Sequence, residues 1–146
     1  MIRILGALAA VAVGTTMVMA QNTAPIKDRQ AIMKKVSDGA KTLGAMVKGE
    51  TTYDAAKATA ILTGWEEGGK KFVTLFPEDS KTGEKTRAKP EIWQNKADFE
   101  AKAGDFLKAV AAAKGAPTID AFKGAYSAVG KACEGCHEKY RGPRPS

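Results

Sequence analysis

This 146-residue sequence has few side chains that could bind a metal or carry out redox chemistry: it contains one histidine and two cysteines. A structural zinc site needs four ligands, so this chain would need a carboxylate or a second chain to complete one. No nucleophile paired with a base and no second cofactor motif stands out. We therefore expect a protein that is not an enzyme.

Aromatic residues are also scarce, at 7% of the chain, and few of them alternate with basic residues. The formal net charge is +7, yet acidic residues are interspersed throughout and no basic helix stripe or nucleic-acid motif is present. The charge therefore favours steering toward acidic protein partners or anionic surfaces, and it does not indicate nucleic-acid binding.

The most apolar run, residues 4–13, is shorter than the roughly 20 residues needed to span a bilayer, so we expect no stable membrane insertion. It follows the basic residue Arg3 and precedes a small-residue cleavage site at residues 18–20, which is the pattern of a secretory signal peptide. We expect cleavage near Ala20, export to the periplasm, and one mature domain over residues 21–146. The alternative is an uncleaved N-terminal anchor.

Runs of β-branched residues are absent, and Ala, Lys and Glu dominate, which predicts an all-α fold. Apolar periodicity predicts a first helix at about residues 26–47 and a third at about 90–114. A second helix is expected to follow capping residues within 51–54 and to reach about 76, and a fourth to follow the cap Thr118 and to end just before Gly142. The short first and third joints make neighbouring helices antiparallel. The sequence therefore predicts an antiparallel up-down-up-down four-helix bundle.

Both cysteines and the histidine fall in one short motif near the C-terminus, CEGCH, in which they are Cys133, Cys136 and His137. The spacing C-x-x-C-H is the attachment signature of a c-type haem. Two thiols can form thioethers with the vinyl groups of one porphyrin, and the adjacent imidazole can reach the iron. A reactive redox pair is disfavoured because the motif lies near a helix C-terminus, where the helix dipole opposes a thiolate. A disulfide across so short a loop would stabilise the chain little. We therefore expect one covalent haem c per chain.

The mature chain resembles the cytochrome c′ family, the class II c-type cytochromes, which includes six-coordinate relatives. The resemblance rests on CEGCHEKYR, on IKDRQAIMK in the first helix, on KGETTYDAA and on KPEIW. It implies that Arg29 and Gln30 lie against the haem, and a buried Arg29 would suit a propionate as a bidentate partner. It also implies that the joint containing Arg87 approaches the propionates, and that the basic Arg141 lies beside the proximal histidine. Members of the family often form homodimers through their first two helices.

Each of these three arginines has an alternative interpretation. Arg29 could be solvent-exposed near its helix end, Arg87 could be solvated, and Arg141 could only offset the helix dipole. The sixth ligand of the iron stays open in the same way. In an up-down bundle, Met33 and His137 come to similar depth, whereas Met46 lies roughly 20 Å further along the first helix. The single histidine excludes bis-histidine ligation within a monomer.

Either Met33 binds the iron, as expected for an electron carrier, or it packs against the haem face. The second alternative describes a five-coordinate, high-spin protein that binds nitric oxide or carbon monoxide. In both cases the haem end of the bundle is expected to collect more basic than acidic residues, so we expect a redox partner that is acidic at its docking face.

Overall fold

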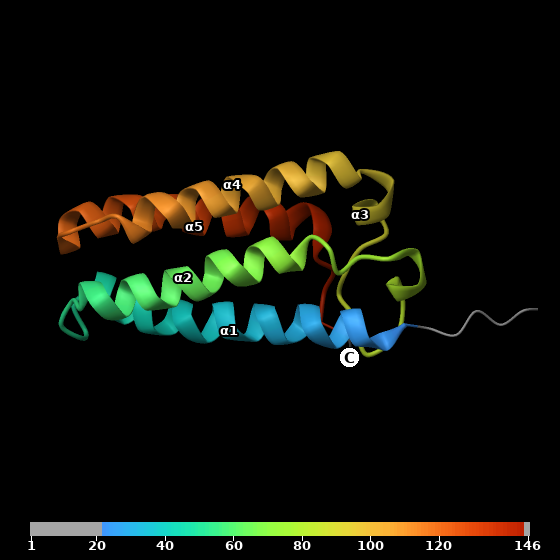
Figure 1. Cartoon of the computed structure of the whole chain (residues 1–146), viewed down its shortest axis with the longest axis horizontal. Coiled ribbons are helices and arrows are strands. Elements are labelled where there is room, and N and C mark those ends of the chain that lie inside the picture. The colour runs from blue at the N-terminus through green and yellow to red at the C-terminus, as the bar shows by residue number, and fades with distance from the viewer. Residues whose placement is uncertain (1–21, 145–146) are drawn as a thin grey trace, which may run out of the picture.

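The computed structural model describes residues 22–144 as a bundle of four long helices with one loop-rich end (Figure 1). The elements, in chain order, are α1 (Thr23–Lys48), α2 (Ala55–Phe72), the 3-10 turn η1 (Glu78–Ser80), α3 (Glu91–Gln94), α4 (Lys96–Lys114) and α5 (Ile119–Tyr140). Successive long helices run in opposite directions, which confirms the predicted up-down-up-down bundle. The expected signal peptide lies outside the described residues.

The helix ends are set by the residues that the sequence singled out for them. Gly49 follows α1 in the left-handed conformation, with φ of 77°, which glycine adopts without strain. The Asp54 carboxylate accepts a 2.9 Å hydrogen bond from the amide of Lys57 at the start of α2. The Thr118 hydroxyl accepts one from the amide of Ala121 in the same way at the start of α5.

The helix α1 begins at Thr23, earlier than predicted, and two larger differences lie near the loop-rich end. The second helix ends at Phe72 and does not reach Phe76, because Phe76 precedes a proline and is thereby disfavoured from helical conformation. The helix expected to run unbroken from Pro90 is split into α3 and α4 at Asn95, whose φ of −129° and ψ of 51° are not helical. The break allows the single turn of α3 to fold back against the loop-rich end.

Two clusters of buried residues hold the fold. The larger runs along the bundle and contains Leu43, Met46, Ala58, Leu62, Trp65, Val110, Ala113, Phe122 and Val129. The smaller lies at the loop-rich end and consists of Phe76, Ile92, Phe99 and Tyr140. Since it takes residues from the loop after α2, from α3, α4 and α5, it fixes that loop against the end of α5.

Backbone pairing reinforces this junction. Ala88 and Arg141 form an isolated antiparallel bridge. The amide of Gly142 donates a 2.7 Å hydrogen bond to the Arg87 carbonyl, and the amide of Lys89 donates to the Tyr140 carbonyl. The loop and the C-terminal segment are therefore joined where α5 ends. None of the helices in residues 22–144 is both long and apolar enough to cross a membrane.

Candidate functional site

The last turns of α5 carry the three residues of the CEGCH motif on one face. Their spacing of three and four residues places Cys133, Cys136 and His137 together, and all three are partly buried. Both cysteines are free thiols. The three side chains line an apolar cavity of about 60 Å³ within the bundle. The remaining lining residues are Ile32, Met33, Val36, Gly69, Phe72, Phe99, Lys102, Ala103, Phe106 and Ala132.

Met33 reaches this cavity from α1, so the structure brings it to the same space as His137. Met46, the other methionine of the described chain, is 4% exposed and belongs to the main core cluster instead. Of the two, only Met33 lines the cavity.

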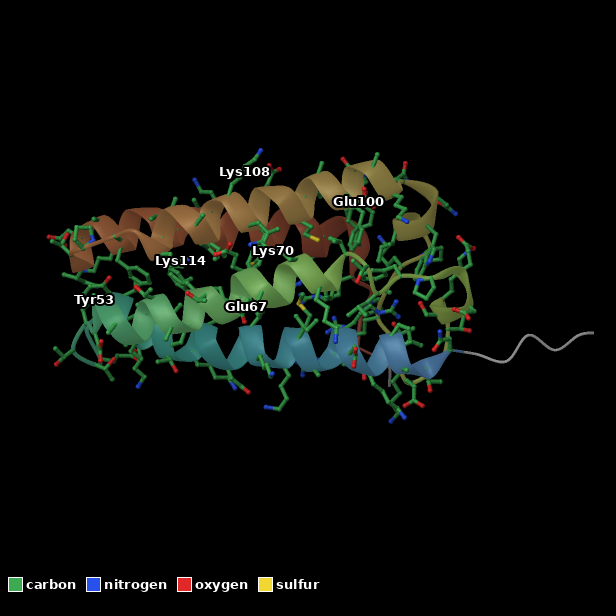
Figure 2. The ribbon with its side chains drawn as sticks, in the orientation of Figure 1. Tyr53, Glu67, Lys70, Glu100, Lys108 and Lys114 are labelled. Atoms are coloured by element: carbon green, nitrogen blue, oxygen red, sulfur yellow. The ribbon has the colours of Figure 1, made fainter. Side chains whose placement is uncertain are left out.

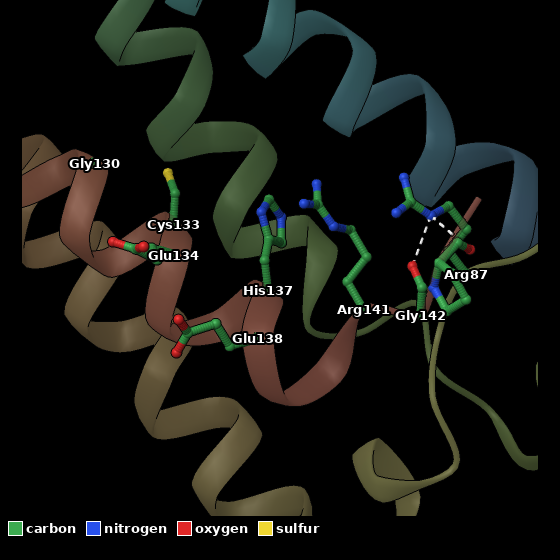
Figure 3. A pocket seen from close by; sticks show the side chains of 9 residues that line it. Arg87, Gly130, Cys133, Glu134, His137, Glu138, Arg141 and Gly142 are labelled. Atoms are coloured by element: carbon green, nitrogen blue, oxygen red, sulfur yellow. Dashed lines mark hydrogen bonds between the residues drawn. The ribbon is translucent and has the colours of Figure 1, made fainter.

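On its other side the motif borders an open groove of about 590 Å³. Cys133 and His137 line the groove as well as the inner cavity, so the two spaces adjoin across these residues. Figure 3 shows Cys133, His137 and Arg141 projecting from the same side of α5, with Arg87 beside Arg141. The charged residues of the groove are Arg87 and Arg141 at one end and Glu134 and Glu138 along α5.

The electrostatics of the site favour a neutral ligand set. Burial lowers the pKa of His137, and the positive charges of Arg141 and Arg87 lower it further. A lowered pKa favours the neutral imidazole, the form in which histidine binds a metal. Burial raises the pKa of Cys133 and of Cys136, the opposite of what a reactive redox thiol needs. The structure gives no support to a thioredoxin-like pair.

Arg87 is fixed by the C-terminal segment. Its Nε donates hydrogen bonds of 2.9 Å to the Gly142 carbonyl and 3.1 Å to the Pro143 carbonyl. Burial lowers the pKa of Arg87, and so do the positive charges of Arg141 and Arg144. Among residues 22–144, no carboxylate forms an ion pair with any of these three arginines. Of the three, Arg87 and Arg141 line the groove, where a guanidinium without an ion-pair partner suits a carboxylate-bearing ligand.

Arg29 and Gln30 face the loop after α2. Arg29 is only 4% exposed, and it donates to the carbonyls of Leu75 and Ser80, each at 2.9 Å. Gln30 is exposed and donates a 2.7 Å hydrogen bond to the Glu84 carbonyl. The buried position expected for Arg29 is observed, but its partners in the structure are groups of the loop and not the propionate that the sequence suggested. Direct contact of either residue with a haem stays a prediction.

Lys102 is a site residue that the sequence reasoning missed. It is partly buried on α4 and lines the inner cavity. Its positive charge acts to lower the pKa of Cys136, against the larger effect of burial. The signal that could have revealed it is its spacing, since Phe99, Lys102 and Phe106 recur at three and four residues on one helix face.

The residues fit a covalently bound haem. Two free thiols one turn apart and an imidazole beside them match the two vinyl groups and the iron, while the apolar lining suits the ring, and Arg87 and Arg141 suit the propionates. The cavity of about 60 Å³ is much smaller than the ring, so the lining side chains would have to move apart to admit it. The fold and this donor set define a c-type cytochrome built on a four-helix bundle.

Comparison with known proteins names the family. The cytochrome c′ family profile matches residues 24–141. The chain is 38% identical to cytochrome c-556 of Rhodopseudomonas palustris over 85% of this chain and 86% of that one. It is 36% identical to cytochrome c′ of the same organism over 90% of both. The solved structure of cytochrome c′ from Rhodopseudomonas palustris superimposes with a TM-score of 0.79 and 34% identity, covering 85% of this chain and all of that one. The chain belongs to the cytochrome c′ family.

Proposed function

We propose that this protein is a periplasmic electron carrier with one haem c per chain, attached through Cys133 and Cys136 and ligated by His137. The observation that carries the proposal is that these three residues line one cavity together with Met33. The haem supplies, when bound, an iron that exchanges one electron between its two oxidation states. Export is supported by the signal-peptide pattern of residues 1–20.

Each residue has a distinct task in this proposal. The two thiols anchor the porphyrin, and the neutral imidazole of His137 offers its lone pair to the iron. Phe72, Phe99 and the other apolar lining residues exclude water from the ring, which is one of the factors that set a haem potential. Arg87 and Arg141 offset the negative charge of the propionates at the open groove.

Met33 decides between two versions of the function. As sixth ligand, its thioether would raise the reduction potential and suit electron transfer. If Met33 only packs beside the iron, the apolar cavity would instead admit nitric oxide or carbon monoxide. The similar relatives carry both names, cytochrome c-556 and cytochrome c′. We propose ligation by Met33 because the described chain brings its side chain to the cavity.

Haem staining of the denatured, purified protein tests the proposal. The wild-type chain should retain its haem through denaturation, with one haem per chain by the pyridine haemochrome spectrum. The double variant Cys133→Ala/Cys136→Ala should lose it, whereas Ser127→Ala, at an exposed position of the same helix, should keep it. Covalent haem in the double variant would refute the attachment site.

A further inference from the structure

Both terminal nitrogens of the Arg29 guanidinium donate hydrogen bonds to other groups of the protein. Nη1 donates to the Leu75 carbonyl at 2.9 Å and to Ser80 Oγ at 3.1 Å. Nη2 donates to the Ser80 carbonyl at 2.9 Å and to Thr86 Oγ1 at 3.4 Å. A guanidinium has five N–H groups, so these contacts take up the four on its terminal nitrogens. Only the Nε–H stays available, which cannot bind a carboxylate in the bidentate manner.

Further contacts of Arg29 also hold it against this loop. Its guanidinium lies 4.4 Å from the ring centroid of Phe76, a cation–π contact with a residue of the loop-end cluster. Ser80, which supplies two of its acceptors, is completely buried. Arg29 therefore ties α1 to the loop at four points between Leu75 and Thr86.

Hydrogen bonds link Thr86 in turn to the segment around Arg141 and His137. Thr86 Oγ1 also accepts a 3.3 Å hydrogen bond from the amide of Ala88, which forms the backbone bridge with Arg141. Arg87, between them, accepts from the amide of Gly142 and donates from its Nε to the Gly142 carbonyl. The amide of Arg141 in turn donates to the His137 carbonyl.

We propose that Arg29 is a positioning residue, which holds the loop in the conformation that places Arg87 and Arg141 beside His137. In this chain it acts on the haem site through Ser80 and Thr86. The consequence for the haem rests on the proposed function, whereas the ordering of the loop does not.

Hydrogen exchange of the haem-loaded protein tests the ordering of the loop. The reporters are the amides of Lys89 and Gly142, which are bonded across the junction and belong to neither Arg29 nor its acceptors. Arg29→Met and the charge-keeping Arg29→Lys should both raise exchange at these amides by about tenfold or more, as expected for lost hydrogen bonds to a charged group. The amides of Gly49 and Phe122, whose acceptors Met46 and Thr118 lie at the other end of the bundle, should exchange as in the wild type.

Arg29→Lys is the decisive variant, because an ammonium keeps the charge that a propionate would need but loses the planar fork. Wild-type exchange at Lys89 and Gly142 in Arg29→Lys would overturn the proposal. If the Arg29 variants do not fold, Thr86→Val removes one acceptor at a partly exposed position, and unchanged exchange there would overturn it equally. Haem staining of each variant separates these results from a failure of the attachment site.

The midpoint potential tests whether Arg29 acts through Arg87. Removing the charge of Arg87 should lower the potential, because an unpaired propionate stabilises the oxidised iron. Arg29→Lys should shift it in the same direction as Arg87→Gln, and the double variant should shift it no further. Additive shifts, or no shift in Arg29→Lys, would contradict action through Arg87.

Discussion

Met33 of α1 and His137 of α5 line the same apolar cavity, although they come from opposite ends of the described chain. α1 packs mainly on α2, and α5 mainly on α4, so α1 and α5 contact each other least of the neighbouring helices. Between these helices lies the apolar cavity of about 60 Å³ that the two side chains share. Met33 is therefore the side chain whose replacement tests the proposed ligation of the iron.

Replacement of Met33 should change the spin state. We expect Met33→Leu, which conserves volume, to convert a low-spin spectrum to a high-spin one and to let reduced iron bind carbon monoxide. Met46→Leu is the matched control: it replaces a buried core methionine, should cost less than about 1.5 kcal/mol of stability, and should leave the spectrum unchanged. Absorption and resonance Raman spectra of both oxidation states give the result. A wild-type protein that is already high-spin, and unaffected by the change, would favour gas binding instead.

Lys102 should raise the reduction potential. Its side chain lines the largely apolar cavity, and its positive charge is close enough to act on the Cys136 thiol. A nearby positive charge disfavours the more positive, oxidised iron. We therefore expect Lys102→Met to lower the midpoint potential in a redox titration. Lys108→Met, on the same helix but exposed and paired with Asp105, should not change it. Equal shifts in the two variants would contradict a local effect.

The periodic part of the fold was predictable from the sequence, for reasons that particular residues make clear. The helix-ending Gly49 and the caps Asp54 and Thr118 act on their own backbone neighbourhoods, so their effect can be recognised locally. The CEGCH motif on α5 could be recognised for the same reason, because its residues are neighbours in the sequence. The break at Asn95 was not predictable, because asparagine is only mildly unfavourable within a helix and the packing of Ile92 and Trp93 decides the outcome.

The partners of Arg29 could not be predicted for a related reason. Its acceptors belong to an irregular loop between 46 and 57 residues away, and no periodicity indicates which loop oxygen faces a given helix. Lys102 was overlooked because a charged residue on a helix usually lies in solvent. Lys102 comes to line the cavity because α4 packs closely against α5.

Acid should remove a stabilising link between α2 and α4. The Glu66 carboxylate accepts hydrogen bonds of 2.6 Å from both Lys70 and Lys114, which lower its pKa from 4.5 to about 2 (Figure 2 labels the two lysines). Because the pKa is lower in the folded state, this stabilisation is fully present above about pH 4.5 and is lost as the pH falls through 2. Glu66→Gln should therefore be less stable than the wild type at pH 6, and the difference should shrink steadily below pH 4.5.

Denaturant unfolding followed by circular dichroism at several pH values measures this difference. Glu67→Gln is the matched control, because the neighbouring Glu67 is exposed and forms no ion pair within residues 22–144. It should leave stability unchanged at every pH. A difference between Glu66→Gln and the wild type that stays constant from pH 6 to pH 2 would contradict the role of the carboxylate.

Electron transfer to an acidic partner should slow as the salt concentration rises. Arg87, Arg141 and Arg144 form no ion pair with a carboxylate in the described chain, and the exposed Lys85 at the same end forms none either. Other lysines there are partly neutralised, as Lys89 is by Glu91 at 3.7 Å. The rim formed by Arg87, Arg141, Arg144 and Lys85 should orient an acidic partner and raise its rate of association. The Debye length falls from about 30 Å at 0.01 M to about 10 Å at 0.1 M, so the effect should weaken over this range.

Charge reversal locates the docking surface. Lys85→Glu should slow second-order electron transfer at low salt and reduce its salt dependence, and adding Lys89→Glu should slow it further. Lys57→Glu changes the net charge by the same amount at the start of α2, the opposite end of the bundle, and should leave the rate near that of the wild type. Stopped-flow measurements of the rate at several ionic strengths make the comparison. If Lys57→Glu slowed the reaction as much as Lys85→Glu, the net charge and not the rim would be responsible. A rate that rose with salt would exclude the rim as the docking surface.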